Sequence, residues 1–345
     1  MSVAKFVIRL CVGVGLVAFL FNKHEVANRD VFVRMLDAPV LVLLGALALN
    51  LAGQTLSAYR WGLLSAMGGR PASFPKTWAV YFSGMFFNMC LPTSIGGDVI
   101  RVVGMSRQTG TKSGAFASVF MDRNVGLAAL LVIGLASSTA MRATIEATVF
   151  KHHFPPLPIW PIFAFLLAGW IAANAAIFSD SFCHAIEAVI SRVRLGFLNV
   201  KLERLHNSVQ AFRKPVRAYA WTFLLSLIYQ LSEIGVVCLL AWGMGIPLSP
   251  LVFCALVPFQ AIASLLPITF NGVGVREAIF CAILMGQLGR TADVKNTALA
   301  LSLTFFSIIV VSSLIGGIVY LVSGMPRPTK AETEDVTQAE TEAVA

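Results

Sequence analysis

The sequence predicts an all-α polytopic membrane protein, with about six transmembrane helices and two re-entrant helical hairpins in an inverted repeat. Of its 345 residues, 57% are hydrophobic and only 12% are charged, against about 45–50% and about 25% in ordinary globular domains. The mean hydropathy is +0.79, and apolar runs of about 20 residues, enough to span a bilayer, recur along the chain. These observations exclude a cytosolic enzyme, a secreted disulfide scaffold and a nucleic-acid-binding domain. The net charge of +9 fits cytoplasmic loops and anionic lipid instead.

Apolar runs define the spans in chain order. The first run is followed by Asn22-Lys23-His24-Glu25 rather than by small residues, so we expect an uncleaved span and not a signal peptide. The six predicted spans are residues 3–21, 39–66, 113–141, 157–178, 217–243 and 297–323.

Two further apolar stretches, residues 77–110 and 250–288, are interrupted by Pro- and Gly-containing breaks. Pro92 and Pro267 are the predicted helix breakers. Each arm has about 12–16 residues and is therefore about 20 Å long. Because the hydrocarbon core is about 30 Å thick, each stretch is predicted to be a re-entrant hairpin whose loop lies in protein or in a wet cavity.

The two breaks also align with each other, since the second Leu-Pro lies 175 residues after the first. The pattern L-P-x-[S/T]-x-x-G-x-x-x-R predicts a duplication within a membrane domain of residues 1–325, with repeats at about 1–141 and 157–323. A basic linker, residues 179–216, is predicted to be cytoplasmic, which places both termini inside. Three spans then separate the hairpins, so the repeat is inverted, as in many transporters. The aligned pairs are Leu91 with Leu266, Pro92 with Pro267, Ser94 with Thr269, Gly97 with Gly272, and Arg101 with Arg276.

Two segments lie outside this core. Residues 184–213 have leucines at helical spacing with basic residues between them. They predict an amphipathic helix, either on the cytoplasmic membrane surface or packed on the bundle. Residues 326–345 are acidic, with almost no large apolar side chain, and are predicted to be a disordered tail.

Ionisable residues inside the apolar segments are the candidate functional groups. An unpaired charge at mid-depth costs about 2.5–3.5 kcal/mol on insertion scales, so we expect pairing or water contact. Asp122 and Arg123 point about 100° apart on a helix, and with Glu233 they are predicted to make structural charge pairs. Arg60 is expected to snorkel to the interface. The eight residues are Arg60, Arg101, Arg123, Arg276, Asp98, Asp122, Glu233 and Glu277.

The helices that begin after the two breaks suggest an anion site, because a helix N-terminus binds phosphate or carboxylate. Arg101 and Arg276 supply guanidinium groups suited to bidentate phosphate binding. We expect two facing cradles. Asp98 and Glu277 either take up protons and gate or couple transport, or form salt bridges with the neighbouring arginines. The remaining predicted substrate contacts are the hydroxyls of Ser94 and Thr269 and the backbone of Gly96, Gly97, Gly272 and Gly274.

The motifs resemble those of the lysylphosphatidylglycerol synthase transmembrane-region family, a flippase-like domain found in the multiple peptide resistance factor and in stand-alone membrane proteins. The resemblance covers about residues 1–325, implies lipid handling, and adds Asn271 to the substrate-binding residues. No aminoacyl-transferase segment follows the membrane part, so we expect a stand-alone member that does not make lysylphosphatidylglycerol by itself. The motifs are Asn88-x-x-Leu-Pro-x-x-x-Gly-Gly-Asp98-x-x-Arg101, Asp122-Arg123-x-x-Gly126-Leu127 and Asn271-Gly-x-Gly-Val-Arg276-Glu277.

The leading hypothesis is a flippase that moves an anionic, phosphate-bearing lipid or lipid-linked head group across a bacterial inner membrane by alternating access. The expected partners are anionic phospholipid or a polyprenyl-linked substrate, an envelope biosynthesis enzyme, and no nucleic acid. The alternative is a non-catalytic scaffold for an envelope lipid or glycolipid enzyme. A membrane-embedded transferase is disfavoured because no nucleophile–base pair is evident. We expect no cofactor and no metal, because neither a C-x-x-C nor an H-E-x-x-H motif occurs.

Overall fold

The computed structural model describes residues 28–67, 71–90, 96–141, 159–179, 210, 212, 216–265 and 270–323, and within these ranges the regular structure is helical. Five of the described helices are long and apolar enough to cross a membrane. They agree within a few residues with five of the six predicted spans and confirm an all-α polytopic membrane protein. The first predicted span, residues 3–21, lies outside the described residues. The five helices are α3 (Val40–Met67), α6 (Lys112–Ala140), α8 (Ile159–Ile177), α11 (Val216–Gly243) and α14 (Ala292–Val322).

The chain divides into two compact units, and the four longest helices each contribute one part to each unit. Unit 1 contains the described parts of Met1–Gly53, Leu130–Ala164 and Ile228–Ser312. Its core is built around buried aromatic and aliphatic side chains, among them Phe253 and Phe280. Its shorter helices are α2 (Asn28–Leu36), α12 (Pro250–Leu265), the 3-10 turn η1 (Phe270–Gly272) and α13 (Val275–Leu288).

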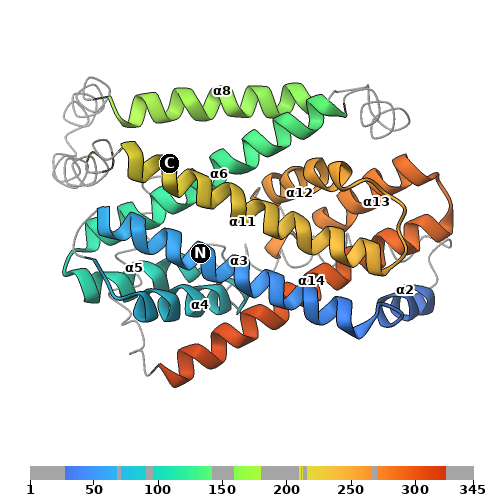
Figure 1. Ribbon diagram of the computed structural model, residues 1–345, viewed down its shortest axis with the longest axis horizontal. Helices are drawn as coiled ribbons and strands as arrows, with labels where there is room; N and C mark the ends of the chain where they lie inside the picture. The colour runs from blue at the N-terminus through green and yellow to red at the C-terminus, as the bar shows by residue number, and fades with distance from the viewer. Residues whose placement is uncertain are drawn as a thin grey trace, which may run out of the picture. The chain divides into compact units, whose positions relative to one another are not determined.

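Unit 2 contains the described parts of Gln54–Ala129, Phe165–Leu227 and Ser313–Ala345. Its two short helices, α4 (Phe74–Cys90) and α5 (Gly96–Thr109), lie side by side (Figure 1). Glycine makes this close approach possible, because a Cβ at Gly97 would overlap the carbonyl oxygen of Gly84. At Gly104 a Cβ would lie 2.8 Å from a methyl carbon of Val80. Gly97 and Gly104 therefore allow the close packing of α4 and α5.

The same order of elements occurs in both units. In unit 2, part of α3 precedes α4 and α5, and part of α6 follows; in unit 1, part of α11 precedes α12 and α13, and part of α14 follows. The short helices have 14 to 17 residues, so each is about 21–26 Å long and shorter than the hydrocarbon core. The duplication, its inversion and the re-entrant placement of the hairpins stay predictions.

Helix α12 contains an internal proline that was not singled out in the sequence. Pro258 has no N–H to donate to the carbonyl of Cys254, four residues earlier. The single O–H of Ser137, on α6, lies within hydrogen-bond distance of that carbonyl oxygen, at 2.9 Å, and of the Ile133 carbonyl oxygen on its own helix, at 2.7 Å, and is shared between them. Within a bilayer such a freed backbone group needs a partner from the protein. Ser137 therefore stabilises the interrupted helix and joins α6 to α12 inside unit 1.

Replacing Ser137 by alanine is expected to lower the free energy of unfolding by about 1 kcal/mol, because the Cys254 carbonyl loses its partner. In a Pro258→Ala background the backbone N–H returns, so the same change should have a smaller effect. Denaturant unfolding of the purified protein in detergent measures both values. Thr139→Ala is the matched control, since that exposed hydroxyl bonds only to carbonyls of its own helix. Equal losses in the two backgrounds would contradict this role of Ser137.

The end of the predicted amphipathic segment packs on unit 2. The Gln210 side chain donates to the carbonyl oxygen of Phe178 at 3.1 Å, and Phe212 is only 2% exposed beside Leu64 and Met121. At these two positions the chain is packed on the helices. The other residues of the 184–213 segment and the predicted tail, residues 326–345, lie outside the described residues.

Candidate functional site

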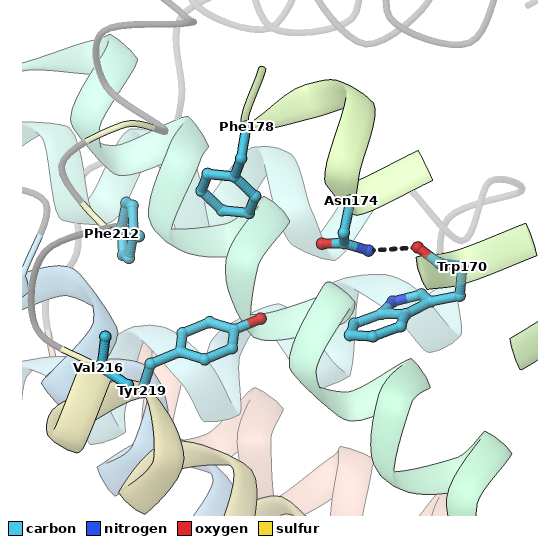
Figure 2. Close-up of a pocket in the computed structure, with 6 residues that line it drawn as sticks. All are labelled: Trp170, Asn174, Phe178, Phe212, Val216 and Tyr219. Atoms are coloured by element: carbon cyan, nitrogen blue, oxygen red, sulfur yellow. Dashed lines mark hydrogen bonds between the residues drawn. The ribbon is translucent and has the colours of Figure 1, made fainter. Parts of the chain in front are cut away.

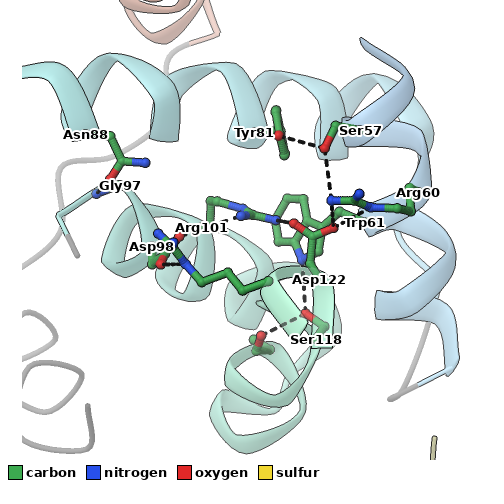
Figure 3. A network of polar contacts seen from close by, with 12 residues as sticks. Ser57, Arg60, Trp61, Tyr81, Asn88, Gly97, Asp98, Arg101, Ser118 and Asp122 are labelled. Atoms are coloured by element: carbon green, nitrogen blue, oxygen red, sulfur yellow. Dashed lines mark hydrogen bonds and ion pairs between the residues drawn. The ribbon is translucent and has the colours of Figure 1, made fainter. Parts of the chain in front are cut away.

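A buried carboxylate in unit 2 joins three helices (Figure 3). Asp122 of α6 accepts hydrogen bonds at Oδ1 from Arg60 Nε and Nη2, at 2.9 and 2.7 Å. Its Oδ2 accepts from Arg101 Nη2 of α5 at 2.6 Å. All three side chains are at most 8% exposed. One carboxylate thus holds two arginines that come from α3 and α5.

Neighbouring side chains fix the orientation of these arginines. Arg60 also donates to Ser226 at 2.7 Å and to Ser57 at 3.1 Å, and the Tyr81 hydroxyl donates to Ser57 at 2.8 Å. The Arg101 guanidinium carbon lies 4.3 Å from the ring centroid of Trp61 and 4.8 Å from that of Tyr81. Such cation–π contacts strengthen when they are shielded from water. The cluster is therefore held in one arrangement by hydrogen bonds and ring stacking.

A second ion pair lies next to the first. Arg123 Nε donates to Asp98 Oδ2, and Arg101 Nη1 lies 3.6 Å from Asp98 Oδ1. The Arg123 side chain is 45% exposed, whereas Asp98 and Arg101 are buried. Two buried polar atoms, Asp98 Oδ1 and Arg101 Nε, have no hydrogen-bond partner. Buried polar groups without partners are unusual in native proteins and mark places where a ligand or water completes the network.

These two ion pairs form the unit 2 cluster, defined as Arg60, Arg101, Arg123, Asp98 and Asp122. Arg101 joins the two pairs, because its guanidinium lies close to both carboxylates. The arrangement is suited to an anion that accepts a hydrogen bond from the buried Nε of Arg101.

The helix starts are less open than the sequence predicted. The Gly97 N–H donates to Asn88 Oδ1 of α4 at 2.9 Å, and the Gly274 N–H donates to Glu277 Oε2 at 2.5 Å. At each helix start one backbone donor is already satisfied by a side chain of the same hairpin. These two backbone N–H groups are therefore not free donors, and the arginines are the stronger candidates for an anion contact.

The corresponding hairpin of unit 1 is electrically neutral. Arg276 donates to Glu277 Oε1 through Nε at 3.1 Å and Nη2 at 2.9 Å, and the Ser302 hydroxyl lies 3.3 Å from the same oxygen. Phe306 covers the guanidinium at 4.1 Å. Both charged side chains are at most 4% exposed. Arg276 is therefore paired and covered within unit 1, whereas the Arg123 side chain of unit 2 is 45% exposed.

The other residues singled out in the sequence lie in several different environments. Arg60 is 3% exposed, so the expectation that it snorkels is wrong; the ion pair with Asp122 holds it inside the protein.

Glu233 accepts a hydrogen bond from Asn50 Nδ2 at 3.0 Å, and the Ser312 hydroxyl donates to Asn50 Oδ1 at 2.7 Å. Asn271 and Gly272 adopt positive φ, 50° and 70°, so they shape the turn before α13. Outside the described residues lie Pro92, Ser94, Pro267 and Thr269.

The sequence analysis missed several members of the network. Ser57 and Trp61 lie within one turn of Arg60 on α3, and Tyr81 comes from α4. The i, i+3 spacing of Ser57 and Arg60 was the available signal. Tyr81 and Ser226 carried no signal, because hydroxyl groups are common in membrane helices and their partners are distant in sequence.

The sequence profile described as lysylphosphatidylglycerol synthase TM region matches residues 6–321. The chain belongs to this family. The family is one of lipid-related, flippase-like membrane proteins, and Asp98, Arg101, Asp122 and Arg123 from its first two motifs meet in the unit 2 cluster. A search of curated proteins found no match.

Proposed function

We propose that the protein is a flippase that moves an anionic, phosphate-bearing lipid or lipid-linked head group across a bacterial inner membrane by alternating access, with both termini in the cytoplasm. The observation that carries the proposal is the buried Arg101 guanidinium, whose Nε has no hydrogen-bond partner, next to the ion pair of Asp98 with the half-exposed Arg123. Membership in the lysylphosphatidylglycerol synthase TM region family supports the lipid class of substrate. No enzymatic step is part of the proposal.

A phosphate fits the chemistry of this cluster. Guanidinium groups bind phosphate through two parallel charge-assisted hydrogen bonds, and Arg101 Nε is a buried donor without a partner. A phosphate oxygen that accepts from Arg101 Nε would satisfy this donor and pair the charge of the lipid with a guanidinium. A paired charge enters a low-dielectric region at much lower cost than a free one.

Asp98 has the position of a gate in this proposal. Its carboxylate holds Arg123, and an arriving phosphate competes for the same guanidinium. When the Arg123 guanidinium leaves the Asp98 carboxylate and pairs with the lipid phosphate, the cluster would open. When it returns to Asp98, the cluster would close, and Arg123 would keep an acidic partner in both states. The proposed site uses unit 2, whereas the neutral pair of Arg276 and Glu277 holds the hairpin of unit 1 together.

The test is lipid movement in liposomes that hold the purified protein and phosphatidylglycerol labelled in one leaflet. Arg123→Gln keeps a donor for Asp98 but removes the charge, so we expect transport to fall about tenfold to hundredfold, the loss of one charge-assisted contact. Arg123→Lys should retain part of the rate. Arg34→Gln is the matched control, because this arginine pairs with the exposed Asp293 of unit 1.

Two results would contradict the proposal. Well-folded wild-type protein that moves no labelled phosphatidylglycerol, lipid-linked sugar phosphate or other anionic lipid would favour a scaffold that holds a biosynthetic enzyme. Movement that is equal in the wild type and in Arg123→Gln would place the anion site elsewhere. Circular dichroism and size-exclusion profiles of each variant separate loss of transport from loss of folding.

A further inference from the structure

Unit 2 also contains an apolar cavity of about 220 Å³ between α8, α11 and the end of the linker (Figure 2). Of the six lining residues that belong to the described part of the chain, four are aromatic, and Figure 2 shows their rings arranged around the space. An engineered apolar cavity of about 150 Å³ in another protein stays dry and binds benzene, so a space of this size and lining is suited to hydrocarbon. The lining residues are Trp170, Asn174, Phe178, Phe212, Val216 and Tyr219.

Two hydrogen bonds join the wall of this cavity to Asn124, the residue that follows Arg123. Asn124 Oδ1 accepts a hydrogen bond from Trp170 Nε1 at 2.7 Å, and Asn124 Nδ2 donates to Asn174 Oδ1 at 2.5 Å. Consecutive residues of a helix point about 100° apart. Helix α6 therefore directs Arg123 to the polar cluster and Asn124 to the cavity wall, on two adjacent faces.

The helices around the cavity expose apolar side chains on their outer sides. Phe165 and Ile171 of α8 are exposed, as are Val216 and Leu224 of α11. In a membrane these side chains lie among lipid chains. The exposed Val216 forms the edge of the cavity, and Phe212, which is 2% exposed, forms part of its wall.

We infer that this cavity binds the end of a hydrocarbon chain of the same anionic lipid whose phosphate binds at the unit 2 cluster. The inference rests on the proposed function and narrows the substrate class to lipids that have an apolar chain and a phosphate together. Binding at both places would discriminate against free phosphate, which lacks the chain, and against neutral lipid, which lacks the charge.

The test uses phosphatidylglycerol with a photoreactive diazirine at the end of one acyl chain, incorporated into liposomes with the full-length protein. Mass spectrometry then locates the adducts. Phe165, which is 77% exposed, reports ordinary membrane lipid, whereas Phe212 is 2% exposed and lines the cavity. Val216→Trp fills the edge and should reduce Phe212 adducts about tenfold, as expected when about two methylene groups lose their apolar site. Leu224→Trp on the same helix is the matched control and should change nothing.

Two further labelling measurements separate this inference from the proposed function. The shared-lipid assignment predicts fewer Phe212 adducts in Arg123→Gln and with phosphatidylcholine that carries the same diazirine chain. Adducts confined to Phe165 and other outward residues would overturn the inference, even if lipid transport is observed. Equal labelling of Phe212 by the two lipids would overturn it as well. Charge-dependent labelling of Phe212 without any transport would support the binding site and count against the flippase.

Discussion

Asp122→Asn is expected to lower the free energy of unfolding by about 3–5 kcal/mol, the usual cost of removing one partner from a buried ion pair. The change leaves Arg60 and Arg101 near each other in a buried region without the carboxylate that joins them. Asparagine offers one neutral oxygen, so it cannot balance two guanidinium charges. Denaturant or thermal unfolding of the purified protein in detergent measures the loss.

Asp293→Asn is the control for this prediction, because Asp293 also pairs with an arginine but is 71% exposed. An exposed pair contributes about 0–1 kcal/mol, so this variant should unfold much like the wild type. Comparable losses in the two variants would show that Asp122 is not a central contact. A large difference would show that burial, rather than the pair itself, sets the cost.

Gly97→Ala should be the second most damaging change, with a loss of about 3 kcal/mol, at the upper end for overpacking. A Cβ at this position would overlap the Gly84 carbonyl oxygen and the Asn88 side chain. Because the carbonyl belongs to the backbone of α4, no rotamer change relieves the clash. The helices α4 and α5 would have to separate, which would also displace Arg101 from Asp122.

Gly169→Ala on α8 provides the matched comparison, since nothing lies within 4 Å of a Cβ there. Alanine has the higher helix propensity, so this change should be neutral or stabilising by up to about 1 kcal/mol. Unfolding curves of the two variants and the wild type form the test. If Gly97→Ala were as stable as Gly169→Ala, the close packing of the hairpin would be contradicted.

The fold class and the span positions could be predicted from the sequence because hydropathy depends on local composition. Helix α3 was expected at 39–66 and occurs at Val40–Met67. Local geometry also indicated that Asp122 and Arg123 face different partners. The partners themselves were not predictable, because Arg60 and Asp122 are 62 residues apart and no spacing rule connects two membrane helices at that distance.

The two aligned arginines differ in a way that the repeated sequence pattern did not predict. Arg101 and Arg276 occupy the same position of the repeated motif, and the sequence therefore suggested equal roles. The structure places Arg101 on a carboxylate of another helix, whereas Arg276 is satisfied by its own neighbour, Glu277. The cavity at Trp170 was also not predictable, since its lining comes from α8, α11 and the linker, which are separate in sequence.

The separation between Arg60 and Asp122 has a consequence for biogenesis. The ribosome delivers α3 first, so Arg60 reaches the insertion machinery 62 residues ahead of its counter-ion. A lone arginine costs up to about 2.5–3.5 kcal/mol to insert, the value for the centre of a helix, and Arg60 lies seven residues before the end of α3. Helix α3 is therefore expected to stay beside the translocon until α6 arrives, so that the first half of the chain enters the bilayer as one group rather than helix by helix.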